Sequence, residues 1–154
     1  MQYQVFKFLH VLGVILLIGN VTITAFWKVF ADRSNDALVI AQAQRIVILA
    51  DWFFTLAGIL LILGGGYGML FVAGISPLDG GWLLWGQGLF VVSGAIWVRI
   101  LVPAQIRQSR IAKALTRETE IPQQYWQYGR TWLVWGIAAT VPLVAAVYVM
   151  IVKP

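Results

Sequence analysis

Three ionisable side chains, His10, Asp51 and Arg99, lie inside long apolar stretches of the sequence. Inside the hydrocarbon of a membrane such a group costs about 3 kcal/mol on insertion scales, so it normally faces the protein interior and has a partner or a function. These three residues are therefore the first candidates for chemistry in this chain.

His10 is the only histidine, and it lies in the stretch FLHVLGVILLIGNVTITAFWK, which begins at Phe8. A neutral imidazole is the commonest metal ligand, and histidine with methionine is a known pair of ligands for haem iron. Met69 and Met150 are expected near the ends of their spans, on the same side of the membrane as His10 and at a similar depth. We therefore predict a haem b or other metal site at His10, with Met69, Met150 or His10 of a second copy as the second ligand. The alternative is that His10 only hydrogen-bonds to a carbonyl of a neighbouring helix.

Asp51 and Arg99 are expected at similar depths in neighbouring helices. Asp51 lies about six residues inside the second apolar stretch, and Arg99 lies about four residues before Pro103, so at 1.5 Å per residue their depths agree within a few Å. We predict an ion pair between them. The pair either fixes the helix register or belongs to an ion pathway that also uses Asn20 and Gln87.

The residue types that are missing limit the chemistry. The chain has no cysteine, which excludes disulfides, thiolate catalysis, iron–sulfur clusters and zinc–cysteine sites. No nucleophile with a base, no paired carboxylates and no zinc-ligand spacing are visible. We therefore do not expect an enzyme, unless the protein is a haem-dependent membrane oxidoreductase.

The elements that must position these residues are membrane helices. The 154 residues are 60% hydrophobic and 11% charged, whereas soluble domains have about 25% charged residues. Four apolar stretches are each long enough to span a membrane. We predict a single all-α domain, residues 1–154, that forms a four-transmembrane-helix bundle with spans at about 4–30, 46–71, 82–102 and 128–152. Gly64 and Gly68 form a small-xxx-small pair that favours close helix contact.

The basic residues predict the orientation. Most of the chain's 11 Lys and Arg residues follow the first and third spans, namely Lys28, Arg33, Arg45, Arg99, Arg107, Arg110, Lys113, Arg117 and Arg130, whereas Lys7 and Lys153 lie at the other ends. Cytoplasmic loops carry the excess of Lys and Arg, so we expect both termini outside the cytoplasm. The same reasoning explains the net charge of +5 without a nucleic-acid partner.

The polar segment 104–124 predicts a membrane-surface contact. Arg107, Arg110, Lys113 and Arg117 recur every three or four residues, so they share one face of a helix. We expect a short amphipathic cytoplasmic segment with its bases over anionic lipid headgroups. Membrane lipids are the expected partners, and the small residues of the spans are compatible with a homo-oligomer or a larger membrane complex.

Two stretches carry a family resemblance. FLHVLGVILLIGNVTITAFWK, followed by ADR, and RIVILADWFFTLAGILLILGGGYG resemble the domain of unknown function 2269 family of small four-helix bacterial membrane proteins. GGWLLWGQGLFVVSGAIWVRILVPAQ fits the same pattern, so the resemblance covers nearly the whole chain. It implies a multi-pass protein of the bacterial plasma membrane and leaves its activity open.

That family is distantly similar to the copper-resistance D membrane domain and to HemJ-type protoporphyrinogen oxidases. In both, a histidine near the start of the first span is important, and in the second it is tied to haem, which implies the same role for His10. The lysine-bearing third span of the HemJ type is replaced here by Trp85 and Gln87, and the histidine-rich copper ligands are absent. A haem protein, a small transporter and a non-catalytic accessory protein therefore remain as alternatives.

Overall fold

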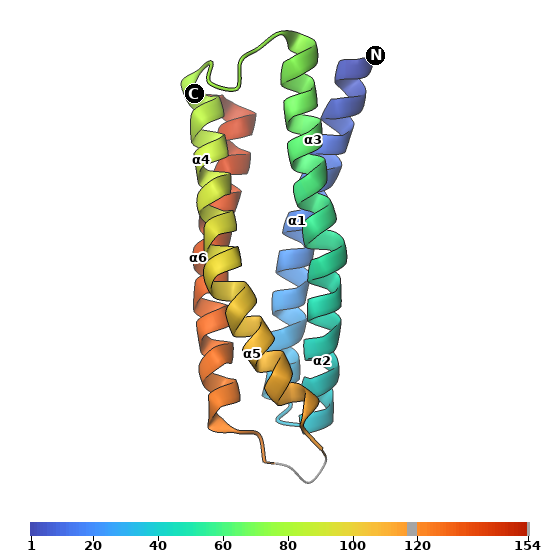
Figure 1. Cartoon of the computed structure of the whole chain (residues 1–154), viewed down its shortest axis with the longest axis vertical. Coiled ribbons are helices and arrows are strands. Elements are labelled where there is room, and N and C mark those ends of the chain that lie inside the picture. Colours follow the sequence, from blue (N-terminus) through green and yellow to red (C-terminus); the bar gives the residue numbers. More distant parts are fainter. Residues whose placement is uncertain (117–119, 154) are drawn as a thin grey trace. The chain divides into compact units, whose positions relative to one another are not determined.

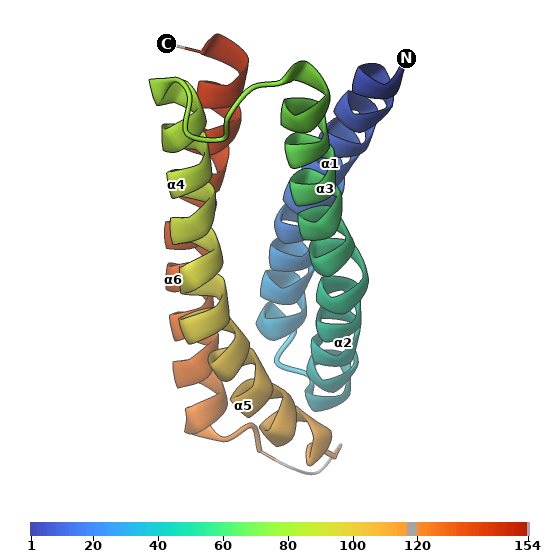
Figure 2. The ribbon, with the colours of Figure 1, turned by 45° about the horizontal axis from the view of Figure 1, so that its top comes forward.

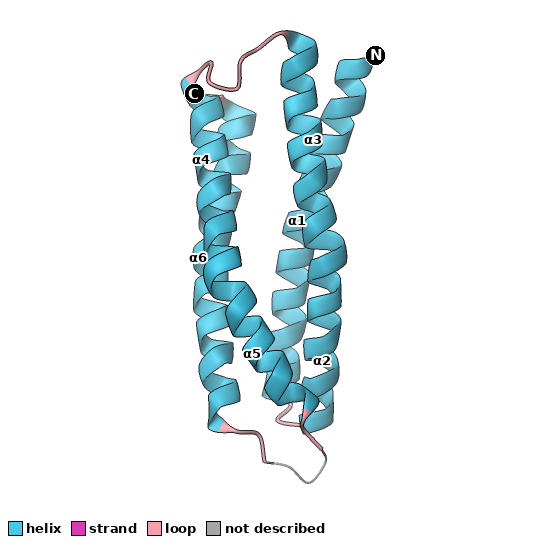
Figure 3. Cartoon of the chain, viewed as in Figure 1, coloured by secondary structure: helices cyan, strands magenta, loops and turns pink. Residues whose placement is uncertain are grey.

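The computed structural model describes residues 1–116 and 120–153, and every regular element in this part of the chain is a helix (Figure 3). The elements in chain order are α1 (Gln2–Arg33), α2 (Ala37–Ala50), η1 (Asp51–Thr55), α3 (Leu56–Ala73), α4 (Gly81–Ile96), η2 (Trp97–Leu101), α5 (Val102–Lys113) and α6 (Gln123–Val152). The two η elements are single π-helical turns, in which the backbone is wider than in an α-helix.

The π turns join neighbouring α-helices without a break. The described residues thus contain four helices that are long and apolar enough to cross a membrane: Gln2–Arg33, Ala37–Ala73, Gly81–Lys113 and Gln123–Val152. The predicted all-α architecture with four spans is confirmed. Most of the helices run beyond the predicted spans, because a helical backbone can continue past the part that crosses the hydrocarbon.

Pro103 does not end the third helix, although the predicted third span stops directly before it, at residue 102. It lies in the first turn of α5, directly after the π turn η2. Proline lacks an N–H and its ring crowds the carbonyl four residues earlier, and a wider turn before it accommodates both effects. The basic segment therefore continues the third helix as far as Lys113 and does not begin a separate surface helix.

The chain forms two compact units. The first unit contains Met1–Phe26 and Val47–Asp79, and the second contains Trp27–Ile46 and the residues from Gly80 onward. Whether residues 1–154 form a single domain stays a prediction.

In the first unit, α1 lies antiparallel to η1 and α3 (Figures 1 and 2). Glycines let the two backbones approach. A Cβ on Gly13 would lie 2.7 Å from the carbonyl oxygen of Gly58, and one on Gly65 would lie 2.5 Å from the backbone nitrogen of His10. A Cβ on Gly64 would meet nothing within 4 Å, so the predicted Gly64–Gly68 pair is not the contact that brings the backbones together.

In the second unit, α4 and α6 pack along each other (Figures 1 and 2). At one end of this pair, the Met150 side chain lies against Gly86. At the other end, a small core of Ile40, Ala112, Leu115 and Tyr125 joins the start of α2 to α5 and α6. This end of the unit also holds most of its buried polar side chains.

Candidate functional site

His10 is held against α3 by a hydrogen bond to the backbone. Its Nδ1 lies 2.8 Å from the carbonyl oxygen of Ile62. A carbonyl only accepts, so Nδ1 carries the ring proton, and Nε2 of the neutral imidazole then presents a lone pair. Among the described residues Nε2 has no hydrogen-bond partner. The predicted carbonyl contact is thus present, but it occupies one ring nitrogen and leaves the other able to bind.

The glycines of α3 make room for this ring. A Cβ on Gly66 would lie 3.2 Å from Nδ1 of His10, and the Gly65 backbone lies directly against the backbone of His10. Because backbone atoms on both helices are in contact here, the imidazole and the Ile62 carbonyl have little freedom to separate. The two helices therefore orient His10 rather than merely enclose it.

The two predicted methionine ligands lie in different units. Met69 follows Gly65 by four residues on the same face of α3, about 6 Å further along the helix. Met150 lies in α6 of the second unit, where it packs on Gly86. Both ligand roles stay predictions.

A bare metal ion would find few ligands in the described residues, which contain no group of three or more His, Cys, Asp or Glu side chains that could hold one. A haem differs because the porphyrin supplies four nitrogen ligands and the protein needs to add only one or two. His10 is one oriented imidazole of this kind, and haem binding there stays a prediction.

A second polar cluster lies where α1 meets η1. Asn20 Nδ2 donates to Asp51 Oδ1 at 2.9 Å and to Thr55 Oγ1 at 3.0 Å, and Thr55 Oγ1 donates to Asp51 Oδ1 at 3.4 Å. Asn20 and Thr55 are buried. Thr55 is absent from the sequence analysis, although its spacing of four residues from Asp51 places it on the same helix face.

The predicted partner of Asp51 belongs to the other unit. Asp51 begins η1 in the first unit, and Arg99 lies in η2 of the second. Their ion pair stays a prediction. Gln87, which the sequence analysis adds to an ion pathway, donates to the Leu83 carbonyl of its own helix at 3.0 Å.

Lys28 forms a cluster that was not predicted from the sequence, where this residue is only one of the bases that flank the spans. The side chain is 3% exposed, and its Nζ donates to Asp32 Oδ2 at 2.8 Å and to the Tyr125 hydroxyl at 3.0 Å. That hydroxyl in turn donates to Asp32 Oδ1 at 2.7 Å. The available signal was the spacing of four residues between Lys28 and Asp32 on one helix.

Further groups complete the surroundings of Lys28. With the Gln108 amide oriented by its hydrogen bonds, its oxygen accepts from Lys28 Nζ at 3.2 Å. The Tyr125 and Trp132 rings lie 5.0 and 5.8 Å from Nζ, within cation–π range. All three ammonium protons thus have an acceptor. A saturated, buried ammonium has no donor left for a substrate, so this cluster connects α1, α5 and α6 rather than performing chemistry.

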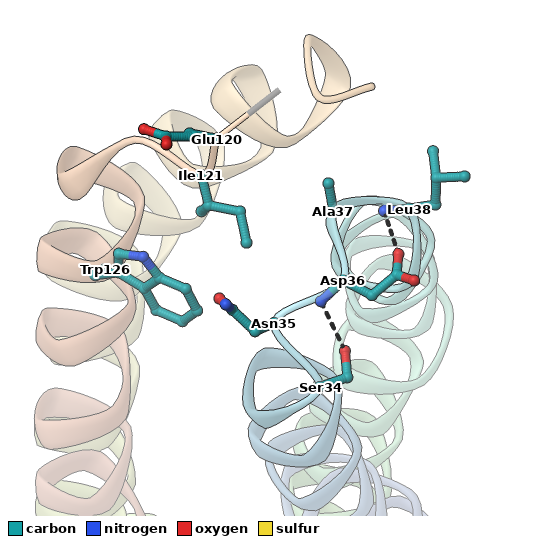
Figure 4. A pocket seen from close by; sticks show the side chains of 8 residues that line it. All are labelled: Ser34, Asn35, Asp36, Ala37, Leu38, Glu120, Ile121 and Trp126. Carbon is teal, nitrogen blue, oxygen red and sulfur yellow. Dashed lines mark hydrogen bonds between the residues drawn. The ribbon is translucent and has the colours of Figure 1, made fainter. Parts of the chain in front are cut away.

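An open cavity of about 880 Å³ lies beside the α1–α2 turn (Figure 4). The Ile121 and Trp126 side chains face it from one wall, and residues 34–38 form the other. Asp36 on its rim accepts from the backbone nitrogens of Leu38 and Val39 at 2.8 and 3.1 Å and so caps α2. None of the predicted site residues lines this cavity.

Three of the four predicted surface bases, Arg107, Arg110 and Lys113, are exposed on α5. The fourth, Arg117, lies outside the described residues. The Arg107 guanidinium is 5.7 Å from the centroid of the Tyr128 ring of α6.

A family model described as "Predicted integral membrane protein (DUF2269)" matches residues 4–154. No curated protein and no solved structure matches the chain. The predicted family is confirmed, and the more distant similarity to copper-resistance D and HemJ-type proteins stays a prediction.

Proposed function

Because the chain belongs to this family of integral membrane proteins, we propose that it binds b-type haem within the membrane through His10. One observation carries the proposal: Nδ1 of His10 is bound to the Ile62 carbonyl at 2.8 Å, while Nε2 has no partner among the described residues. A histidine that only stabilised packing would be expected to satisfy both polar ring atoms when half-buried among apolar helices.

The backbone contact of His10 is the arrangement that metal-binding histidines use. Such a residue almost always donates its second ring N–H to a carbonyl or a carboxylate, which fixes the tautomer and raises the basicity of the ligating nitrogen. Ile62 supplies that acceptor from α3, and the glycine contacts of α1 and α3 hold it in place.

When bound, haem supplies one-electron transfer at the iron. In this chain His10 would be one residue that holds the iron, and Met69 would be the candidate second ligand from the same unit. Met150 or His10 of a second copy are the alternatives. The proposed setting is the bacterial plasma membrane, and the proposed role is electron transfer or a haem-dependent oxidoreductase reaction.

The test is the visible absorption spectrum of the full chain, purified in mild detergent from cells supplied with a haem precursor. The proposal expects a strong Soret band that responds to oxidation and reduction. The variant His10→Gln is expected to lose the band, because the Gln amide can still donate to the Ile62 carbonyl but does not bind haem iron.

Two controls separate loss of the ligand from loss of the fold. Size-exclusion profiles of wild type and His10→Gln should coincide, and added imidazole should restore part of the band in His10→Gly. Met69→Leu should keep the band and change its position if Met69 is the second ligand. A wild-type protein that stays colourless with haem present, or a His10→Gln variant with an unchanged band, would refute haem binding at His10.

A further inference from the structure

The two faces of α5 differ sharply. Ala104, Gln105, Gln108 and Ala112 are buried against the second unit. The Gln105 carbonyl accepts from Gln44 Nε2 at 3.4 Å, and Gln108 reaches Lys28. The buried face therefore fixes the rotation of α5 about its own axis and determines which residues point outward.

The outward side carries what we call the basic face: Arg107, Arg110 and Lys113, all exposed. At about 100° per residue, steps of three keep these side chains within about a third of the helix circumference. The α5 sequence VPAQIRQSRIAK contains no acidic residue. Among the described residues, none of the three bases forms an ion pair with a carboxylate. The basic face thus presents three positive charges that this part of the chain does not neutralise.

The basic face lies at the height along the third helix where a membrane surface is expected. The helix Gly81–Lys113 is continuous, and about 20 residues of it are enough to cross the hydrocarbon layer. Counted from Gly81, that layer ends near Leu101, and Arg107 follows about 9 Å later along the axis. Arg and Lys side chains are long enough to reach the headgroup layer from there.

Arg107 is also oriented for anion binding. Its guanidinium lies 5.7 Å from the centroid of the Tyr128 ring, a contact that restricts the side chain and leaves its N–H donors available. Arg110 and Lys113 lie in the last turn of α5, where the helix dipole favours cations. Arg107 lies too far from the helix end for that explanation.

We propose that the basic face is a binding site for the phosphate of an anionic phospholipid, with phosphatidylglycerol as the chemical class. Arginine binds phosphate through two parallel N–H donors, and a membrane lipid is delivered to this height by the bilayer itself. Binding there would attach the end of the third span and the α5–α6 contact to the headgroup layer.

The experiment is native mass spectrometry of the full chain in neutral detergent, titrated with short-chain phosphatidylglycerol or phosphatidylcholine. Each base near a membrane surface changes the affinity about fivefold, so the triple variant Arg107→Gln/Arg110→Gln/Lys113→Gln should bind phosphatidylglycerol roughly a hundredfold more weakly. Phosphatidylcholine binding should not change.

A matched control removes three exposed bases of the second unit that lie outside α5: Arg33→Gln/Arg45→Gln/Arg130→Gln. The proposal expects this variant to bind phosphatidylglycerol within about threefold of wild type, because direct contacts outweigh the general field of screened charges. Equal loss in both triple variants would mean that only net charge matters. No preference for phosphatidylglycerol over phosphatidylcholine, or full displacement by equimolar inorganic phosphate, would also overturn the site.

A second measurement on the wild-type protein covers the case in which the triple variant does not fold. A photoactivatable phosphatidylglycerol that carries its reactive group at the headgroup is cross-linked to the protein in vesicles, and the labelled peptides are sequenced. Labels concentrated on α5 and the neighbouring turn of α6 support the proposal. Labels spread evenly over the peptides at that end of the helices refute it.

Discussion

His10 and Lys28 are both basic side chains in apolar helices, and the number of their partners separates them. His10 has one ring nitrogen bonded to Ile62 and the other without a partner in the described residues. Lys28 has acceptors for all three of its protons in Asp32, Tyr125 and Gln108. A half-buried group with a free lone pair can bind a ligand, whereas a buried group with every donor engaged stabilises the fold.

Removing Lys28 should therefore destabilise the protein strongly. In Lys28→Met, the Asp32 carboxylate and the Tyr125 hydroxyl lose their cation in a largely buried place. We expect a loss of about 3 kcal/mol in the free energy of unfolding, because breaking a buried pair leaves an uncompensated charge. The measurement is unfolding in detergent, followed by circular dichroism.

Lys113→Met is the matched control, because Lys113 is exposed and its replacement should change the free energy of unfolding by less than about 0.5 kcal/mol. The double variant Lys28→Met/Asp32→Leu should recover part of the loss, since it removes both charges. Equal stability of Lys28→Met and Lys113→Met would show that the cluster contributes nothing.

At the scale of elements, backbone contact between α1 and α3 places the polar residues of the first unit. The contact residues on α1 are Phe6, His10, Gly13, Leu17 and Asn20, spaced alternately by four and three, which is the spacing of one helix face. Glycines occupy the positions where this face of α1 contacts the backbone of α3. Small residues take this role in membrane helices because lipid offers no hydrophobic drive for helices to associate.

The two neighbouring glycines Gly64 and Gly65 should respond to alanine with opposite signs. Gly65→Ala places a methyl group against the His10 backbone, which cannot move as a side chain can, so we expect a loss of about 1–3 kcal/mol in the free energy of unfolding. Gly64→Ala meets open space and should stabilise the helix by about 0.5–1 kcal/mol. Thermal unfolding of both variants in detergent checks this.

The same pair tests the geometry of the first unit. If Gly64→Ala were the more harmful substitution, the face of α3 that meets α1 would have to be rotated from the one described. Wild-type protein extracted in the same detergent is measured in parallel, as a control for differences in lipid content.

At the scale of the whole molecule, the distribution of charge predicts how the helices cross the membrane. Most Lys and Arg residues lie near the α1–α2 turn, in the second half of the helix Gly81–Lys113 and at the start of α6, while the loop 74–80 between α3 and α4 contains none. The positive-inside rule then assigns the α1–α2 turn to the cytoplasm and the loop 74–80 to the outside.

Single cysteines test this orientation without background, because the natural chain has none. Ser34→Cys lies in the α1–α2 turn and Ser76→Cys in the loop 74–80, and both positions are exposed. A membrane-impermeant maleimide should label Ser76→Cys in intact cells and Ser34→Cys only after lysis. The reverse pattern would place both termini in the cytoplasm.

The sequence by itself determined the helical class, the four spans and the family, because these depend on the length of the apolar stretches and on motifs that are contiguous in the chain. It also pointed to His10, Asp51 and Asn20, since a polar residue in an apolar stretch is conspicuous without any structure. Lys28 and Gln108 were not conspicuous, because they lie near helix ends, where polar residues are common.

Only the tertiary structure decided which of these residues share partners. Thr55 joins Asn20 and Asp51 through contacts between helices, and Tyr125 meets Lys28 across 97 residues of chain. The continuation of the third helix through Pro103 likewise depended on a π turn. Whether Gly65 or Gly64 lies against α1 depended on the rotation of one helix against another. Such rotations are set by packing over a whole helix face, and no local pattern of residues encodes them.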